Sequence, residues 1–148
     1  MTSDFPWMDT IKTNIAAISG LENRTFGYDK PPASIEGLCA VILFEGGTWE
    51  YSLGGPLEGT YDVQIIIYTP AQILGEAMSQ AAAFILPVRN KMAGDIQLGG
   101  LVKQILPTPD RRTFEGPGQI AYGENKFMGV AFFYRVELNE TGTYTPAA

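Results

Sequence analysis

Histidine is absent from this chain of 148 residues, and cysteine occurs once. Without histidine the chain lacks the most common general base near neutral pH and the most frequent transition-metal ligand of proteins. The single cysteine, Cys39, excludes an intrachain disulfide, and its place in the apolar segment 38–44 favours a buried, unreactive thiol. This cysteine usage fits a reducing compartment or a virion.

Long apolar runs and basic clusters are missing too. No run of about 18 apolar residues occurs, and residues 1–4 lack the pattern of a signal peptide, so we expect neither membrane insertion nor secretion. The net charge is −6, and the one basic pair, Arg111 and Arg112, follows Asp110. We therefore expect no tight nucleic-acid binding, although an acidic surface suits a channel through which DNA slides without sticking.

Sequence motifs for catalysis or cofactor binding do not replace the missing histidine. Neither a Gly-x-Ser-x-Gly elbow nor a Ser-x-x-Lys motif occurs, and no oxygen-rich calcium loop is present. The glycine pairs at 46–47, 54–55 and 99–100 are not followed by Lys-Ser or Lys-Thr, so they predict turns rather than phosphate loops. We expect no cofactor and no metal.

Four carboxylates that lie close together in the sequence leave acid–base catalysis as an alternative. They are Glu45, Glu50, Glu58 and Asp62. Each stands beside a glycine or at an alternating strand position, which is typical of a solvated charge. We therefore expect no catalytic residues and no enzyme activity.

Composition predicts a globular domain, because 45% of the residues are hydrophobic and 18% are charged. We expect one α+β domain over residues 1–138 and an extended C-terminal arm over 139–148. The helical spacing of apolar residues predicts a first helix from Asp4 to near Ser19. A second helix is expected from Pro70 to about Leu86, with Thr69 as its N-cap and Gln72 completing a capping box.

Strands are predicted from short apolar or alternating segments. The expected strands are 38–44, 48–52 after a hairpin at 45–47, 60–68, the end of 98–106, a short one within 112–122, and 127–138. This order favours an antiparallel or mixed β-sheet with two helices packed on one face. Because 38–44 and 127–138 are apolar on both sides, the second face of the sheet also needs cover. Either an internal layer or a neighbour in a closed head-to-tail ring would supply it.

Short motifs at the ends of these elements cover most of the chain. They are Ile18-Ser19-Gly20-Leu21, Tyr28-Asp29-Lys30-Pro31, the apolar strand through Phe44, Tyr61-Asp62-Val63-Gln64-Ile65, Gly94-Asp95-Ile96-Gln97-Leu98-Gly99-Gly100 and Tyr134-Arg135-Val136. The arrangement resembles the tail terminator, or tail-completion, proteins of long-tailed bacteriophages. The glycine-rich stretch 46–59 departs from that pattern.

The resemblance implies a structural virion protein, assembled in the host cytoplasm, whose subunits form a six-fold ring. Such a ring caps the tail tube and joins it to the head connector or stopper protein, and DNA passes through its lumen without specific binding. In that family the function resides in surfaces, so the resemblance assigns no catalytic residues. A head-to-tail adaptor, a tail-tube subunit and a small-ligand binding module are the alternatives.

Five residues in loop-flanked segments are expected to contact other subunits or partners: Trp49, Tyr51, Arg111, Arg112 and Phe114. Trp49 and Tyr51 share one face of a short strand. A stacking platform for bases or sugars is an alternative there, but the lack of basic neighbours favours packing. Replacing both arginines by glutamate is expected to preserve folding and to impair assembly.

Overall fold

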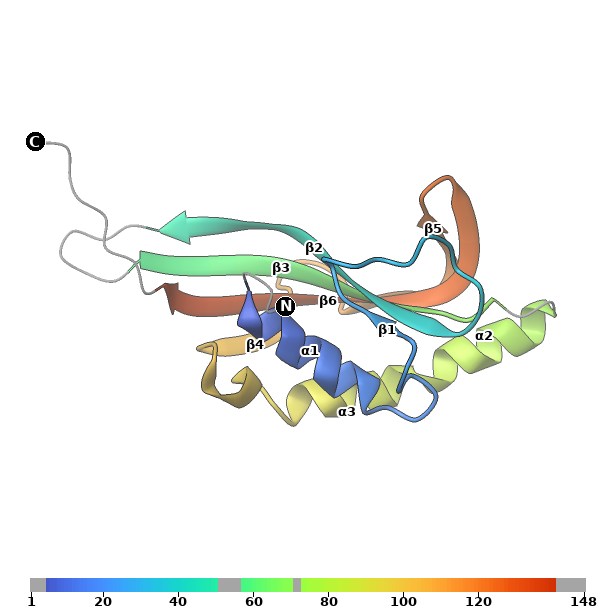
Figure 1. Ribbon diagram of the computed structural model, residues 1–148, viewed down its shortest axis with the longest axis horizontal. Coiled ribbons are helices and arrows are strands. Elements are labelled where there is room, and N and C mark those ends of the chain that lie inside the picture. The colour runs from blue at the N-terminus through green and yellow to red at the C-terminus, as the bar shows by residue number, and fades with distance from the viewer. Residues whose placement is uncertain (1–4, 51–56, 71–72, 141–148) are drawn as a thin grey trace, which may run out of the picture.

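A computed structural model describes residues 5–50, 57–70 and 73–140 (Figure 1). Within these residues the chain forms a six-stranded sheet with its helices on one side. The elements, in chain order, are α1 Pro6–Ala16, β1 Thr25–Phe26, β2 Cys39–Glu50, β3 Leu57–Tyr68, α2 Leu74–Ala83, α3 Ile85–Ala93, the 3-10 turn η1 Leu98–Gly100, β4 Gln104–Pro107, β5 Phe114–Tyr122 and β6 Asn125–Glu140.

The sheet is mixed, as the sequence predicted, and the fold is α+β. Its strand order is β1-β2-β3-β6-β4, and β5 also pairs with β6. Only the contact between β1 and β2 is parallel. β3 pairs with β6 from Gly129 to Glu140, so β4 and β5 lie one after the other along the opposite edge of β6.

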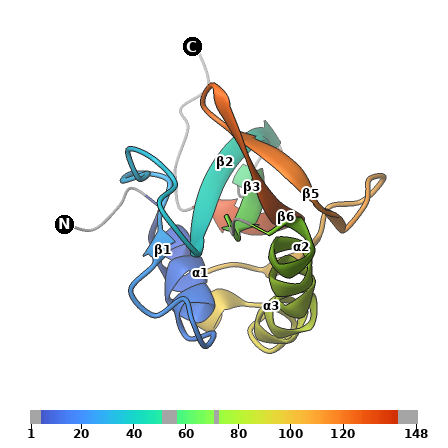
Figure 2. The same cartoon turned by 90° about the vertical axis from the view of Figure 1, so that its right-hand side faces the viewer.

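The helices form one layer beneath the sheet, with α1 beside a second rod made of α2 and α3 (Figure 2). Phe84 is both the C-cap of α2 and the N-cap of α3, so the second predicted helix is two short helices end to end. The first helix begins at Pro6, in the first-turn position that proline favours. Its buried face packs on the sheet through Trp7, Met8, Ile11 and Ile15.

The predicted start of the second helix is wrong. The N-cap of α2 is Ile73, and the Thr69 hydroxyl donates instead to the carbonyl oxygen of Ala77 at 2.9 Å. The backbone N–H of Thr69 donates to the carbonyl oxygen of Met128 at 2.8 Å, which continues the strand pairing one residue past Tyr68. Thr69 therefore stays extended, while Gln72 lies outside the described residues.

The hairpin predicted at 45–47 is also wrong, because β2 continues through this segment to Glu50. The register against β3 shifts between Phe44 and Gly46, so Glu45 is a bulge and the strand bends without reversing. Gly47 permits this packing, since a Cβ atom on it would lie 2.7 Å from Cδ1 of Tyr61. The link from β2 to β3 falls in 51–56, outside the described residues.

The second face of the sheet is covered from within the subunit over half of its length. Six sheet residues there are at most 2% exposed: Cys39, Val41, Ile66, Tyr68, Ala131 and Phe133. Ile35 from the segment before β2 and Tyr122 and Phe127 from the β5–β6 hairpin pack against them, and Figure 2 shows that hairpin folding over the sheet. The expectation that a neighbour covers this part of the face is therefore wrong, since an internal layer does so.

The boundary expected at residue 138 lies inside β6, which runs to Glu140. The rest of the expected arm, residues 141–148, lies outside the described residues. None of the described helices is long and apolar enough to cross a membrane.

Candidate interaction surface

The sheet extends beyond the helices at one end, where β2, β3 and β6 reach past α1 and β4 (left in Figure 1). We call this part the projecting end; it comprises residues 46–50, 57–62 and 135–140. The register places Glu50 opposite Glu58, and Glu58 opposite Asn139. The three strands therefore end at the same level.

Trp49 is the most exposed aromatic side chain of the described residues, at 57%. Its Nε1 atom donates a hydrogen bond to Oη of Tyr61 at 2.7 Å. Tyr61 is only 4% exposed and packs edge-on against the aromatic rings of Phe5 and Phe44. This hydrogen bond holds the Trp49 indole on the helix side of the projecting end, with most of its surface open to solvent.

The opposite face of the projecting end is charged. It carries Thr48 and Glu50 from β2, Glu58 and Thr60 from β3, and Glu137 and Asn139 from β6. Lys103 lies at the edge, where its backbone N–H donates to the carbonyl oxygen of Glu137 at 2.8 Å. Two like charges directly opposite each other, as at Glu50 and Glu58, destabilise a strand pair.

The other two carboxylates of the sequence cluster have partners on different strands. Asp62 accepts a hydrogen bond from Nε of Arg135 at 2.9 Å, an ion pair across neighbouring strands that raises the pKa of Arg135. Glu45 forms an ion pair with Arg111 at 3.3 Å. In the described part of the chain no group of three or more histidine, cysteine or carboxylate side chains is placed to hold a metal ion.

The five expected contact residues do not form one patch. Phe114 lies opposite Phe132 in the register, on the helix side, and is 38% exposed. Arg111 lies on the other face, with its guanidinium over the ring of Phe133. Arg112 is exposed, and Tyr51 falls outside the described residues.

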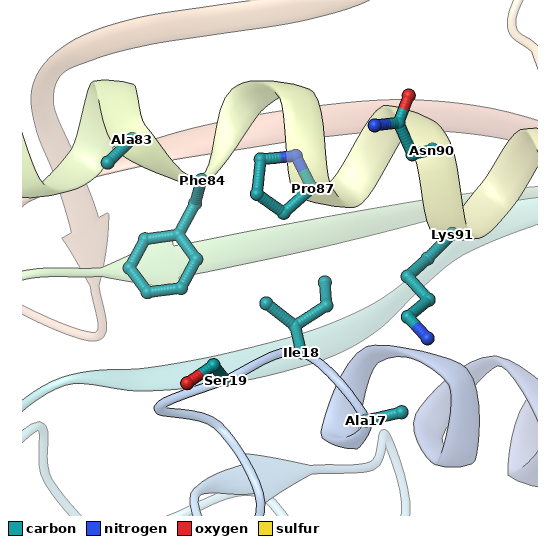
Figure 3. Close-up of a pocket in the computed structure, with 8 residues that line it drawn as sticks. All are labelled: Ala17, Ile18, Ser19, Ala83, Phe84, Pro87, Asn90 and Lys91. Carbon is teal, nitrogen blue, oxygen red and sulfur yellow. The ribbon is translucent and has the colours of Figure 1, made fainter.

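A groove that the sequence did not predict lies between the end of α1 and the junction of α2 and α3 (Figure 3). Its volume is about 620 Å³. Ile18, Phe84 and Pro87 point into it, while the polar ends of Asn90 and Lys91 stand along one side. Its walls come from segments more than sixty residues apart in sequence, and only the packing of the helices brings them together.

Comparison of the chain with protein-family models and with curated proteins found no match.

Proposed function

We propose that the chain is a non-enzymatic ring subunit of a virus tail, a tail terminator that caps the tail tube and joins it to the head connector. The observation that carries the proposal is the projecting end, a part of the sheet with open backbone edges on both sides. An open edge offers unpaired N–H and C=O groups to another chain. Residues 141–148, outside the described part, adjoin one of these edges.

One open edge belongs to β2. β1 pairs only with Ala40 and Val41, and from Ile42 to Glu50 no further backbone partner occurs among the described residues. The other open edge belongs to β6, whose pairing with β4 and Lys103 stops at Glu137. Because the two edges are different and lie on opposite sides, a contact between them is head-to-tail. Such contacts form a ring when the rotation per subunit closes.

The overall charge supports passage of DNA through the ring without specific binding. The net charge of −6 repels phosphates at short range, and basic residues are not clustered enough to retain a duplex. The partners of the ring would then be the tail-tube protein on one side and the head connector or stopper protein on the other.

Electron microscopy of the purified chain tests the proposal. We expect closed rings with one copy number. Tubes that grow without a limit would instead identify a tail-tube subunit, and rings that bind the connector but not the tube would identify a head-to-tail adaptor. Monomers alone would overturn the proposal.

The groove beside Phe84 favours a second candidate, a small-ligand binding module, because apolar clefts of this size hold small molecules. Native mass spectrometry tests this alternative. A monomer that retains a ligand of defined mass, and that loses it on Phe84→Ala substitution, would favour the binding module over the ring subunit.

A further inference from the structure

We infer that residues 48–50 of β2 pair with residues 138–140 of β6 from a second copy of the chain, and that Trp49 of one copy packs on Leu138 of the next. The inference rests on the proposed function, because it specifies the contact that closes the ring. It follows from the direction, level and side-chain pattern of the two open edges.

The two edges are matched in direction and level. β2 is antiparallel to β3, and β3 is antiparallel to β6, so β2 and β6 run the same way. When a second copy continues the sheet beside the first, β2 and β6 become parallel neighbours. Glu50 and Asn139 share the level of Glu58, so these two residues meet across the new contact.

The apolar sides of the two edges also match. Trp49 lies opposite Gly59 in the register, and Gly59 lies opposite Leu138, so all three are on the helix side of the sheet. Leu138 is half-buried, and Trp49 is 57% exposed. Side by side, the indole and the leucine side chain would cover apolar surface that each subunit leaves open. Large aromatic side chains commonly anchor protein contacts in this way.

The charged sides of the two edges avoid repulsion. On the face away from the helices, Glu50 meets the Asn139 amide, and Thr48 meets Glu137. An amide or a hydroxyl can donate to a carboxylate, so no two carboxylates stand directly opposite each other in this pairing. Within one subunit, by contrast, Glu50 stands opposite Glu58.

Pairing of two β2 edges with each other is the competing arrangement. It would be antiparallel about Thr48 and would set Trp49 against Gly47 of the other copy. The ring of Tyr61 already covers that glycine, with its Cδ1 atom 2.7 Å from where a Cβ would stand. This symmetric pair would also leave the β6 edge open and close no ring.

Disulfide trapping in the full chain tests the inference. Glu50→Cys and Asn139→Cys are introduced together, the protein is oxidised, free thiols including Cys39 are alkylated, and the products are separated under denaturing conditions. The two cysteines of one copy flank β3, about 10 Å apart at the usual strand spacing, which is too far for an intrachain bridge. Thr48→Cys alone reports on the symmetric pair. Ser34→Cys with Asn139→Cys controls for random collisions.

A ladder of covalent multimers from the Glu50→Cys, Asn139→Cys protein, at least tenfold more than from the control pair, is the expected result. Rings of the unmodified chain without such a ladder would overturn this pairing and leave the proposed function standing. Covalent dimers from Thr48→Cys alone would overturn it in favour of the symmetric pair. A chain that stays monomeric before any substitution would overturn the ring and this contact together.

Discussion

The guanidinium carbon of Arg111 lies 3.6 Å from the centre of the Phe133 ring, and its Nη1 atom is 3.3 Å from a carboxylate oxygen of Glu45. Phe133 belongs to β6 and Glu45 to β2, with β3 between them. One side chain therefore crosses the second face of the sheet, at the border between its buried apolar half and its charged half. Arg111 acts within the subunit before any partner is present.

Loss of the Arg111 side chain should destabilise the fold. A cation–π contact contributes about 0.5–2 kcal/mol and a partly exposed ion pair up to about 1 kcal/mol, so Arg111→Ala should lower the free energy of unfolding by about 1–2 kcal/mol. Urea denaturation measures the change. Arg112→Ala, one position away on the exposed loop, is the matched control and should change stability by less than about 0.5 kcal/mol. Equal effects of the two substitutions would contradict this role of Arg111.

Because Arg111 is engaged internally, the paired glutamate substitution cannot separate folding from assembly. Arg112→Glu alone is the cleaner test of an assembly contact. We expect an unchanged unfolding transition and a lower yield of rings in electron microscopy. Normal rings from Arg112→Glu would remove this residue from the contact surface.

The absence of a side chain at Gly47 should matter more than its backbone freedom. A methyl group there would meet the Tyr61 ring and the carbonyl oxygen of Thr60, both 2.7 Å from the added carbon. We expect Gly47→Ala to cost about 1–3 kcal/mol of stability, as overpacking usually does. Gly37→Ala is the control, since nothing lies within 4 Å of its added carbon. A melting temperature that falls no further for Gly47→Ala than for Gly37→Ala would refute the close packing.

The Tyr68 hydroxyl makes stability sensitive to alkaline pH. Burial, with smaller contributions from Cys39 and Tyr122, raises the pKa of Tyr68 to about 12. Since the folded pKa exceeds the unfolded value of 10.0, the contribution is complete below pH 10 and is lost as pH rises toward 12. Tyr68→Phe also removes a 2.9 Å hydrogen bond to the carbonyl oxygen of Ala121, at a cost of about 0.5–1.5 kcal/mol near neutral pH. The stability gap between the two proteins should narrow above pH 10, and a constant gap would argue against the shift.

Asp95 should contribute to stability in the opposite pH range. A hydrogen bond from the Asn14 side chain and another from the Gly99 backbone N–H, each 2.9 Å long, lower its pKa. This contribution is present above the unfolded value of 3.8 and is lost as pH falls through the folded value. Asn14→Ala should therefore be less damaging at about pH 3 than at about pH 7. Helix propensity does not depend on pH, so a difference that stays constant would exclude the hydrogen bond as its cause.

Much of the sheet could be predicted from local patterns. The alternation in 60–68 and 127–138 identified β3 and β6, and the spacing from Met8 to Ile15 identified α1. Periodicity reports which side of an element is buried, and in these segments a single core decides that. The break at Phe84 and the bulge at Glu45 were missed, because nothing in the local pattern distinguishes a bend in one element from the boundary between two.

The interaction surface was only partly predictable. Aromatic and basic residues in loop-flanked segments drew attention to Trp49 and Arg111, but their environments depend on strands far apart in sequence. The open edge at Leu138 and the groove at Phe84 exist only because of tertiary packing. The same is true of the cover that the β5–β6 hairpin gives to the second face, which removed one reason for expecting a neighbour.

The molar mass of the purified chain in solution tests the central claim most directly. Light scattering over a wide range of concentrations should give a mass near six times 16.1 kDa, with no larger species. Trp49→Ala should shift this mass toward that of a single copy while the protein stays folded. A mass of one copy at every concentration would contradict the ring.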